Sequence, residues 1–261
     1  MTRAVMHAAV WALAMCLLAC STLVFAAADD PRDPLDSSRW RYMRAAHFRD
    51  APVVFDERVQ VWVPGAADNS GTTPVQIRAP GLDDVVQIRV IADANADSRV
   101  LDYFPVGAQA AIGFSLVVEQ ATPLRAAMRT GDGVWHIGGR WVDAEGGGCA
   151  PASVIPTVDL TAGTQPVIAA HRWARHENSQ RLKFRIRLPA SGTPARSTEQ
   201  MTVRDDASDV RVRIVAGTSL DTASVFTLDI DSRAPLQIEA RDTTGQRYRT
   251  RVWQPLDEAS R

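Results

Sequence analysis

Arg181-Leu182-Lys183-Phe184-Arg185-Ile186-Arg187-Leu188 is the stretch that decides the fold, because apolar and basic residues alternate over eight positions. Successive side chains of a β-strand point to opposite faces, so one face of this strand is apolar and the other is charged. Such a strand buries one face in a core and leaves the other in water. The stretch therefore predicts a half-buried strand of an antiparallel sheet.

The same alternation recurs on both sides of this stretch. It is found at residues 58–63, 75–77, 86–90, 114–118, 210–214, 226–230, 236–240 and 248–252. Turn signals separate these runs, among them Asp132-Gly133, Gly138-Gly139 and Asp242–Gly245. The second of these signals predicts a hairpin between 134–137 and 140–142. Short strands with frequent turns predict an all-β chain of two tandem immunoglobulin-like antiparallel β-sandwich domains.

Composition places the boundaries of these two domains. Residues 154–166 are rich in proline, threonine and glycine, which is typical of a linker. The linker separates a first domain at 37–153 from a second at 167–254. Before the first strand, Trp40, Met43 and Ala46-His47 follow one another at helical spacing.

The segment before this short helix contains possible capping residues and two prolines. A side-chain oxygen of Asp36, Ser37 or Ser38 can cap the first turn of the helix. Residues 29–36, which include Pro31 and Pro34, are expected to be poorly ordered.

Residues 1–28 have the features of a signal peptide. Arg3 precedes the apolar run Ala8–Ala19, and Val24–Ala28 offers small residues for cleavage. An exported protein is expected, in the periplasm if the source is a Gram-negative bacterium. The alternative is a lipoprotein, because Leu17-Leu18-Ala19-Cys20 resembles a lipobox and would anchor the chain through Cys20.

The charge balance argues against binding to nucleic acid. The 261 residues carry a net charge of −1, and a chain near neutrality does not attract a polyanion. No stretch after residue 28 is apolar enough to cross a membrane, so the mature protein is expected not to be transmembrane.

Gly146-Gly147-Gly148-Cys149-Ala150-Pro151 holds the one cysteine outside the export segment. An unpaired cysteine in an exported chain is a candidate reactive or intermolecular thiol. Glycines give the arm little bulk and wide backbone freedom, and Pro151 stiffens the backbone after the cysteine. The arm can therefore carry the thiol into a cleft of another protein. The alternative is a glycine-rich loop with an incidental cysteine.

Other chemistry has less support in the sequence. A catalytic cysteine needs a base, and His136 is the nearest histidine to Cys149, while His47, His171 and His176 are more distant candidates. No cysteine-hydrolase signature surrounds any of them. Asp93–Asp97 resembles the start of a calcium loop, but Ser98 and Phe104 occupy positions where that loop requires glycine and glutamate. We predict no metal, no cofactor and no catalytic residue.

Several stretches of the first half resemble the SoxY sulfur-carrier family, in which Gly-Gly-Cys follows a small β-domain. They are Val54–Val59, Asp93–Asn95, Thr122–Ala127, Trp135-His136 and Gly146–Pro151. The second β half lies where a SoxZ-like partner is expected, although Leu188–Gly192 lacks the histidine and methionine of the SoxZ pattern. The whole chain thus resembles fused SoxYZ-like carrier proteins associated with quinoprotein dehydrogenases.

The resemblance implies a carrier and not an enzyme. Cys149 would hold a sulfur-containing or other small group covalently and present it to periplasmic sulfur-processing or redox enzymes. A quinoprotein dehydrogenase and its cytochrome are the partners that the fused family implies. Two alternatives stay open: a binding module that assists such a dehydrogenase with Cys149 dispensable, and an intermolecular disulfide that links two copies through Cys149.

Overall fold

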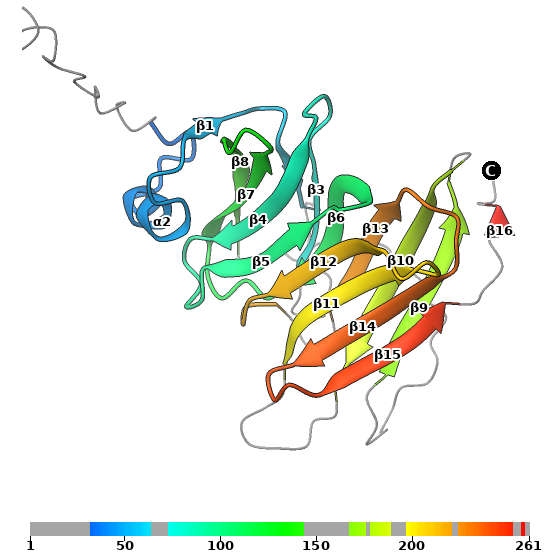
Figure 1. Cartoon of the computed structure of the whole chain (residues 1–261). Helices are drawn as coiled ribbons and strands as arrows, with labels where there is room; N and C mark the ends of the chain where they lie inside the picture. Colours follow the sequence, from blue (N-terminus) through cyan, green and yellow to red (C-terminus); the bar gives the residue numbers. More distant parts are fainter. Residues whose placement is uncertain are drawn as a thin grey trace, which may run out of the picture. The chain divides into compact units, whose positions relative to one another are not determined.

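The structure is a computed structural model, and it describes residues 32–63, 73–143, 167–175, 178–188, 197–220, 224–252 and 257–258. Within these ranges the chain is all-β with one short helix, as the alternation predicts (Figure 1). The elements are α2 (Trp40–His47), β1 (Val53–Phe55), β2 (Gln60–Trp62), β3 (Thr73–Arg78), β4 (Val85–Ala92), β5 (Arg99–Phe104), β6 (Ala108–Leu116), β7 (Thr122–Thr130), β8 (Trp135–Val142), β9 (Val167–Ala174), β10 (Gln180–Arg187), β11 (Thr198–Asp205), β12 (Val210–Ala216), β13 (Val225–Ile230), β14 (Leu236–Asp242), β15 (Arg247–Val252) and β16 (Asp257–Glu258).

The strands form two sheets. The nine-stranded sheet has the order β1-β8-β7-β4-β5-β12-β11-β14-β15, and the seven-stranded sheet has the order β16-β9-β10-β13-β6-β3-β2. The β1–β8 and β16–β9 pairs are parallel and the other pairs are antiparallel. The stretch 181–188 becomes β10, whose apolar face is buried as its alternation predicts.

Both sheets contain strands from the two halves of the sequence (Figure 1). In the nine-stranded sheet β12 pairs with β5, with Val215 opposite Asp102. In the seven-stranded sheet β13 pairs with β6, with Thr227 opposite Gly113. Residues before and after the expected linker therefore share continuous hydrogen-bonded ladders. The division into separate domains at 154–166 stays a prediction, because those residues lie outside the described ranges.

One hydrophobic core fills the space between the sheets along both halves. It contains side chains from each half, such as Ile88 and Phe114 from the first and Phe184 and Ile238 from the second. Phe184 and Phe226 stack with ring centroids 5.1 Å apart. Each of these strands turns its alternate apolar residues inward, which explains why the core follows the period of two in the sequence.

Helix α2 is confirmed, but its predicted cap and lead segment are not. The helix buries Trp40 and Met43 in a second apolar cluster that includes Trp135 and Ile137 of β8. Arg39 is the N-cap residue, and no side chain caps the helix. Residues 29–36 were expected to be poorly ordered. This is wrong for the described residues among them, since Asp33 is buried and forms an ion pair with Arg125.

The predicted hairpin at Gly138-Gly139 is also wrong. Residues 135–142 form the single strand β8, and the turn at Asp132-Gly133 joins it to β7. A Cβ on Gly138 would lie 1.9 Å from the carbonyl oxygen of Val59, and one on Gly139 would lie 2.7 Å from that of Leu124. The two glycines therefore permit a close approach of backbones inside the sheet.

The turn predicted at Asp242–Gly245 is confirmed and is held by a buried carboxylate. Asp242 is 0% exposed and accepts hydrogen bonds from the Thr244 and Gln246 amides and from the Thr244 and Tyr248 hydroxyls. Burial alone would raise the pKa of Asp242, but these hydrogen bonds stabilise the ionised form and hold its pKa below the usual value.

Replacing Asp242 by asparagine is expected to lower the free energy of unfolding at pH 7 by about 1–3 kcal/mol, because buried donors lose a charged acceptor. A carboxylate with a lowered folded-state pKa stabilises the fold above its unfolded pKa of about 3.9, and this contribution is lost as the pH falls. The variant should therefore lose less stability between pH 6 and pH 3 than the parent does. Urea unfolding across this range measures the difference. The exposed Asp206→Asn serves as the control, and an unchanged pH dependence in Asp242→Asn would contradict the assignment.

Candidate functional site

The candidate arm lies outside the described residues. Cys149 and its neighbours Gly146, Gly147, Gly148, Ala150 and Pro151 fall between Asp143 and Val167, the nearest described positions on either side. What the structure describes is the base of the arm. That base is β8, which ends at Val142, seven positions before Cys149.

β8 is paired with β7 along its whole length and with β1 over its first three residues. It pairs in parallel with β1 on one side and antiparallel with β7 on the other, where Val142 lies opposite Thr122. Trp135, Ile137 and Val142 are buried. The side chain of Trp141 is half exposed, and its indole nitrogen donates to the Leu35 carbonyl oxygen at 3.0 Å. The point from which the arm departs is therefore fixed by pairing and by packing.

A cavity of about 390 Å³ lies beside Gly138 and Gly139 of β8. Its wall includes the apolar side chains of Leu35, Phe55 and Ile137, and the acidic residues Asp56 and Glu57 also line it. The space of the two missing side chains is taken up by the backbone of Val59 and Leu124, so the cavity lies beside the glycines and is not formed by them.

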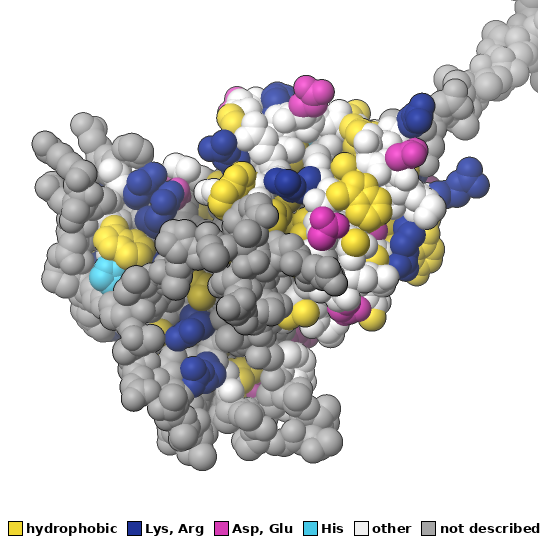
Figure 2. All heavy atoms as spheres, turned by 180° about the vertical axis from the view of Figure 1, so that it is seen from behind, with side chains coloured by type: hydrophobic (Ala, Val, Ile, Leu, Met, Phe, Trp, Pro, Cys, Tyr) yellow, Lys and Arg dark blue, Asp and Glu magenta, His cyan; other side chains and the backbone are white. Residues whose placement is uncertain are grey.

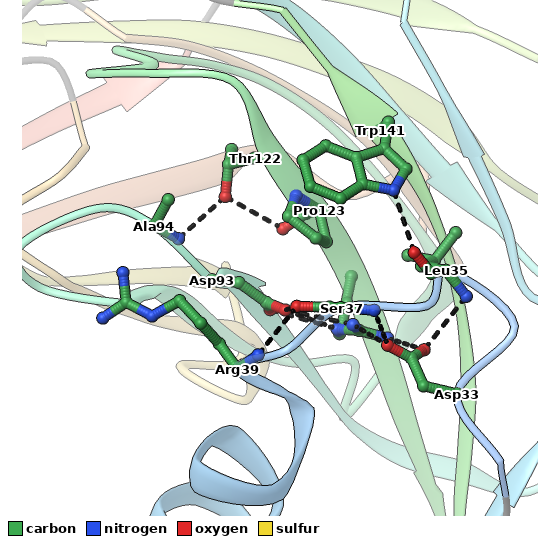
Figure 3. Close-up of polar contacts among 10 residues, drawn as sticks. Asp33, Leu35, Ser37, Arg39, Asp93, Ala94, Thr122, Pro123 and Trp141 are labelled. Carbon is green, nitrogen blue, oxygen red and sulfur yellow. Dashed lines mark hydrogen bonds and ion pairs between the residues drawn. The ribbon is translucent and has the colours of Figure 1, made fainter.

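Arg125 lies at the same cavity but offers it no free charge. Its side chain is 1% exposed and holds two carboxylates, with nitrogen–oxygen distances of 2.7 Å and 2.7 Å to Asp33 and 3.0 Å to Asp93. The guanidinium carbon lies 4.8 Å from the centre of the Trp40 ring. The Ser37 hydroxyl donates to Asp93 at 2.9 Å (Figure 3). This buried network joins the segment before α2 to β7 and to the turn after β4.

His136 is oriented by a carboxylate. Its Nδ1 lies 2.8 Å from Oδ2 of Asp56, and the Arg58 guanidinium binds the same carboxylate at 2.7 Å. The hydrogen bonds from Arg58, and then that from His136, hold the pKa of Asp56 well below its usual range. Because Nδ1 is engaged, only Nε2 of His136 is left for a reacting group. The Cys149–His136 pair itself stays a prediction, since Cys149 is not described.

A comparison with protein families bears on this half of the chain. Residues 44–149 match the family model described as "Sulfur oxidation protein SoxY". Residues 44–149 therefore form a SoxY family domain. The match begins within α2 and ends at Cys149, so it includes β8 and the glycines that come after it.

Solved structures offer weaker likenesses to the chain that contains this SoxY domain. The sulfur carrier protein SoxY from Chlorobium limicola f thiosulfatophilum aligns with 19% identity and a TM-score of 0.35 over 41% of this chain and 96% of its own. A putative membrane anchored protein from Corynebacterium diphtheriae aligns with 9% identity and a TM-score of 0.25 over 77% of this chain and 60% of its own. No curated protein matches the chain at a significant level.

The polar side chains of the turn Asp93–Asp97 in the SoxY domain form hydrogen bonds and ion pairs with other residues of the chain. Asp93 binds Arg125, Asn95 donates to the Val117 carbonyl oxygen, and Asp97 accepts from Thr218 and Arg99. The turn between β4 and β5 is therefore stabilised by contacts with protein groups, as expected for a turn with a structural role. Within the described ranges, no cluster of three histidine, cysteine or acidic side chains is placed to hold a metal ion.

The remaining histidines are dispersed. His47 of α2 is hydrogen bonded through Nε2 to the Ser98 hydroxyl at 2.8 Å, and burial and then the charge of Arg89 lower its pKa. His171 lies on β9 in the second half, with its ring 4.2 Å from that of Trp173. His176 lies outside the described residues. The described part of the chain also contains no helix with the length and apolar content needed to cross a membrane.

The sequence reasoning missed Arg125 as the centre of a buried network. The signal was present, because Arg125 interrupts the otherwise apolar run from Pro123 to Met128, and an arginine in a buried strand needs a buried counter-ion. The counter-ions are distant in sequence, however, and Asp33 lies in a segment with two prolines that was expected to be poorly ordered.

Proposed function

We propose that this protein is an exported SoxYZ-like carrier, which holds a sulfur-containing group covalently on Cys149 and presents it to partner enzymes. The observation that carries the proposal is the SoxY family match, which extends to Cys149 itself. The fixed base at β8 supports it, because a carrier needs an attachment point that is held at a defined place on a rigid body.

The chemistry of such a carrier requires no oxidant. The Cys149 thiolate attacks the outer sulfur of a persulfide, R–S–SH, on a partner enzyme. A bond forms between the Cys149 sulfur and that outer sulfur, the S–S bond of the partner breaks, and the partner leaves as a thiolate, R–S⁻. Atoms and charge balance, and the reverse reaction unloads the carrier at the next enzyme.

The partner enzyme supplies the activation of the thiol. Thiolate is the reactive form, and basic neighbours lower a thiol pKa. The residues that flank Cys149 include no lysine or arginine, whereas Glu145 and Asp143 precede it closely. Acidic neighbours disfavour thiolate, so loading is expected to take place inside a partner site that carries positive charge.

The second half belongs to the same proposal. A SoxZ-like role for β9–β15 is supported by its position after the arm and by its pairing with the SoxY domain through β12 and β13. Export by residues 1–28, with the lipoprotein alternative at Cys20, and partnership with a quinoprotein dehydrogenase and its cytochrome are parts of the proposal that rest on the sequence.

Intact mass spectrometry of the protein purified from its native compartment tests the carrier function. A sulfur-containing mass increase is expected that reductant removes and that Cys149→Ser abolishes completely. The matched control is Ser153→Cys in the Cys149→Ser background, which keeps one thiol in the same segment and should not restore loading. An unmodified Cys149 under every growth condition contradicts the proposal.

The same Cys149→Ser strain separates the alternatives. Full physiological function in that strain favours a binding module that assists a dehydrogenase. A dimer on a non-reducing gel that reductant dissolves, in place of a sulfur adduct, favours the intermolecular disulfide.

A further inference from the structure

The outer face of the seven-stranded sheet carries a groove where the two halves of the chain pair. Strand pairing places one residue from each of six neighbouring strands in a single row across this face. In order they are Trp62, Gln76, Gly113, Thr227, Lys183 and His171. Figure 2 shows this side of the molecule, with lysine and arginine side chains spread over the described part of its surface. The row crosses from the SoxY domain into the second half at the Gly113–Thr227 pair.

The groove has the size of a small-molecule site. Its volume is about 330 Å³, at the lower end of the range in which small ligands bind. Gly113 lies at its middle, and a Cβ there would touch the Thr227 Cβ at 3.4 Å, so the hollow results from the missing side chain. Trp62, which is 55% exposed, lines one end, and Lys183 lines the other. The backbones of β2 and β10 are four strand spacings apart, about 19 Å, and the long side chains of Trp62 and Lys183 line the space between them.

One of the two positively charged side chains of the groove is not neutralised by a described residue. Arg181 at its rim is bound by both carboxylate oxygens of Asp229 at 2.8 Å. Lys183, the only lysine of the sequence, has neither an ion pair nor a side-chain hydrogen bond with any described residue. Desolvation alone lowers its pKa, as burial without a counter-ion does. A partly buried ammonium without a partner is costly unless an anion binds it.

Two further nitrogen atoms beside Lys183 lack partners. His171 is directly opposite Lys183 on β9, and Arg185 comes next on the same face of β10. Nδ1 of His171 and Nε of Arg185 are buried, and neither has a hydrogen-bond partner among the described residues. Buried polar atoms are nearly always hydrogen bonded, so an unmet one in a native protein calls for an explanation. Neither residue lines the groove itself, so among these three groups the Lys183 ammonium is the one that faces it.

We propose that this groove is a binding site for a small organic anion, with a carboxylate or sulfonate group on an apolar body. The anionic oxygens accept hydrogen bonds from the Lys183 ammonium, and the apolar body lies over Gly113 against the ring of Trp62. The inference does not depend on the carrier function.

The single lysine permits a direct test. Acetylation of the full-length mature protein by an amine-directed reagent modifies one side chain besides the N-terminus, and mass spectrometry of the peptide that contains Lys183 follows its rate. We use 2-naphthoate and 2-naphthalenesulfonate as probes and 2-naphthalenemethanol as the neutral control. Both anions should slow acetylation of Lys183 by about tenfold at saturation, and the neutral control should not.

Two variants test the proposed position of the ligand in the groove, and two others serve as controls. Lys183→Gln should weaken binding of 2-naphthoate at least about tenfold in calorimetry, as expected for loss of a charged hydrogen bond. Gly113→Val fills the hollow with a residue that suits a strand, and it should abolish binding while the protein stays folded. Arg78→Gln, a charge change on neighbouring β3 that leaves Lys183 intact, should bind normally. Cys149→Ser should also bind normally, which separates this site from the carrier function.

Three results overturn the proposal. One is equal protection of Lys183 by the anions and the neutral control. A second is normal binding by folded Gly113→Val. The third is that Lys183 resists acetylation in the absence of a probe but becomes reactive in the Asp159→Asn or Glu145→Gln variant. This result would mean that an acidic residue of the chain itself occupies the groove.

Discussion

Replacing Arg125 by methionine is expected to lower the free energy of unfolding by about 3–5 kcal/mol. Methionine keeps much of the length of arginine but removes the charge. The carboxylates of Asp33 and Asp93, which are 8% and 0% exposed, would then lie buried without a counter-ion. A buried charge without a partner is far more costly than a lost surface ion pair, and the variant also loses the contact with the Trp40 ring.

Urea unfolding followed by tryptophan fluorescence measures this loss. The matched control is Arg249→Met, which breaks an exposed ion pair with Glu239 and should cost less than about 1 kcal/mol. Adding Asp33→Asn and Asp93→Asn to Arg125→Met should recover part of the stability, because the uncompensated charges are removed. Equal losses for Arg125→Met and Arg249→Met would show that the network is not a main support of the fold.

The pH dependence gives a second readout of the same network. Burial acts to raise the pKa of Asp33, but hydrogen bonds from Arg125 and from the Ser37 and Leu35 amides lower it below its usual value. The ionised carboxylate therefore stabilises the parent above the unfolded pKa of about 3.9, and this contribution is lost as the pH falls. In Arg125→Met that contribution is already absent, so the stability gap between the two proteins should narrow in acid.

Gly138→Ala is expected to cost about 3 kcal/mol or more. The added methyl group would lie 1.9 Å from the Val59 carbonyl oxygen and 2.8 Å from its carbon. Both atoms belong to backbone, so relief requires β8 to move away from the segment before β2. Because β8 is also the base of the Cys149 arm, the variant should lose sulfur loading together with stability.

The control for this prediction is Gly113→Ala. Both glycines lie in strands and neither has a positive φ, but a methyl group on Gly113 meets Thr227 at an ordinary contact distance of 3.4 Å. Its thermal midpoint should stay close to that of the parent, while the midpoint of Gly138→Ala should fall by roughly 5–10 °C for a loss of this size in a chain this long. Similar midpoints for the two variants would mean that the close approach at Gly138 is relieved easily.

Much of the fold could be predicted from the sequence, because its strands are half buried. The strand at 181–188 turns every second residue into the core, and a local pattern of this kind survives in any all-β arrangement. Helix α2 could be predicted from the spacing of Trp40 and Met43. The sequence could not predict that β5 pairs with β12 and β6 with β13, because strand neighbours far apart in sequence leave no local signal.

The predictions were wrong where a residue type that is typical of turns or disorder has a different structural role. Gly138-Gly139 carries a strong turn signal, yet these glycines serve a close approach of backbones inside β8. The prolines around Asp33 suggested disorder, yet its carboxylate is the counter-ion of an arginine that is 92 positions away. The candidate carrier residue Cys149 came from the sequence and the family resemblance. The groove at Lys183, by contrast, required the strand pairing across the two halves.

The edge strands of the two sheets are the places where another copy of the protein could add a strand. Among the described residues, β1 and β2 are three residues long and β16 is two, which leaves little unpaired backbone for a neighbour to extend. The longer boundary strand β15 exposes Arg247, Arg249 and Arg251 along its length. Charged side chains along an edge strand disfavour its pairing with a strand of another molecule, so this border is protected against extension by a neighbouring copy.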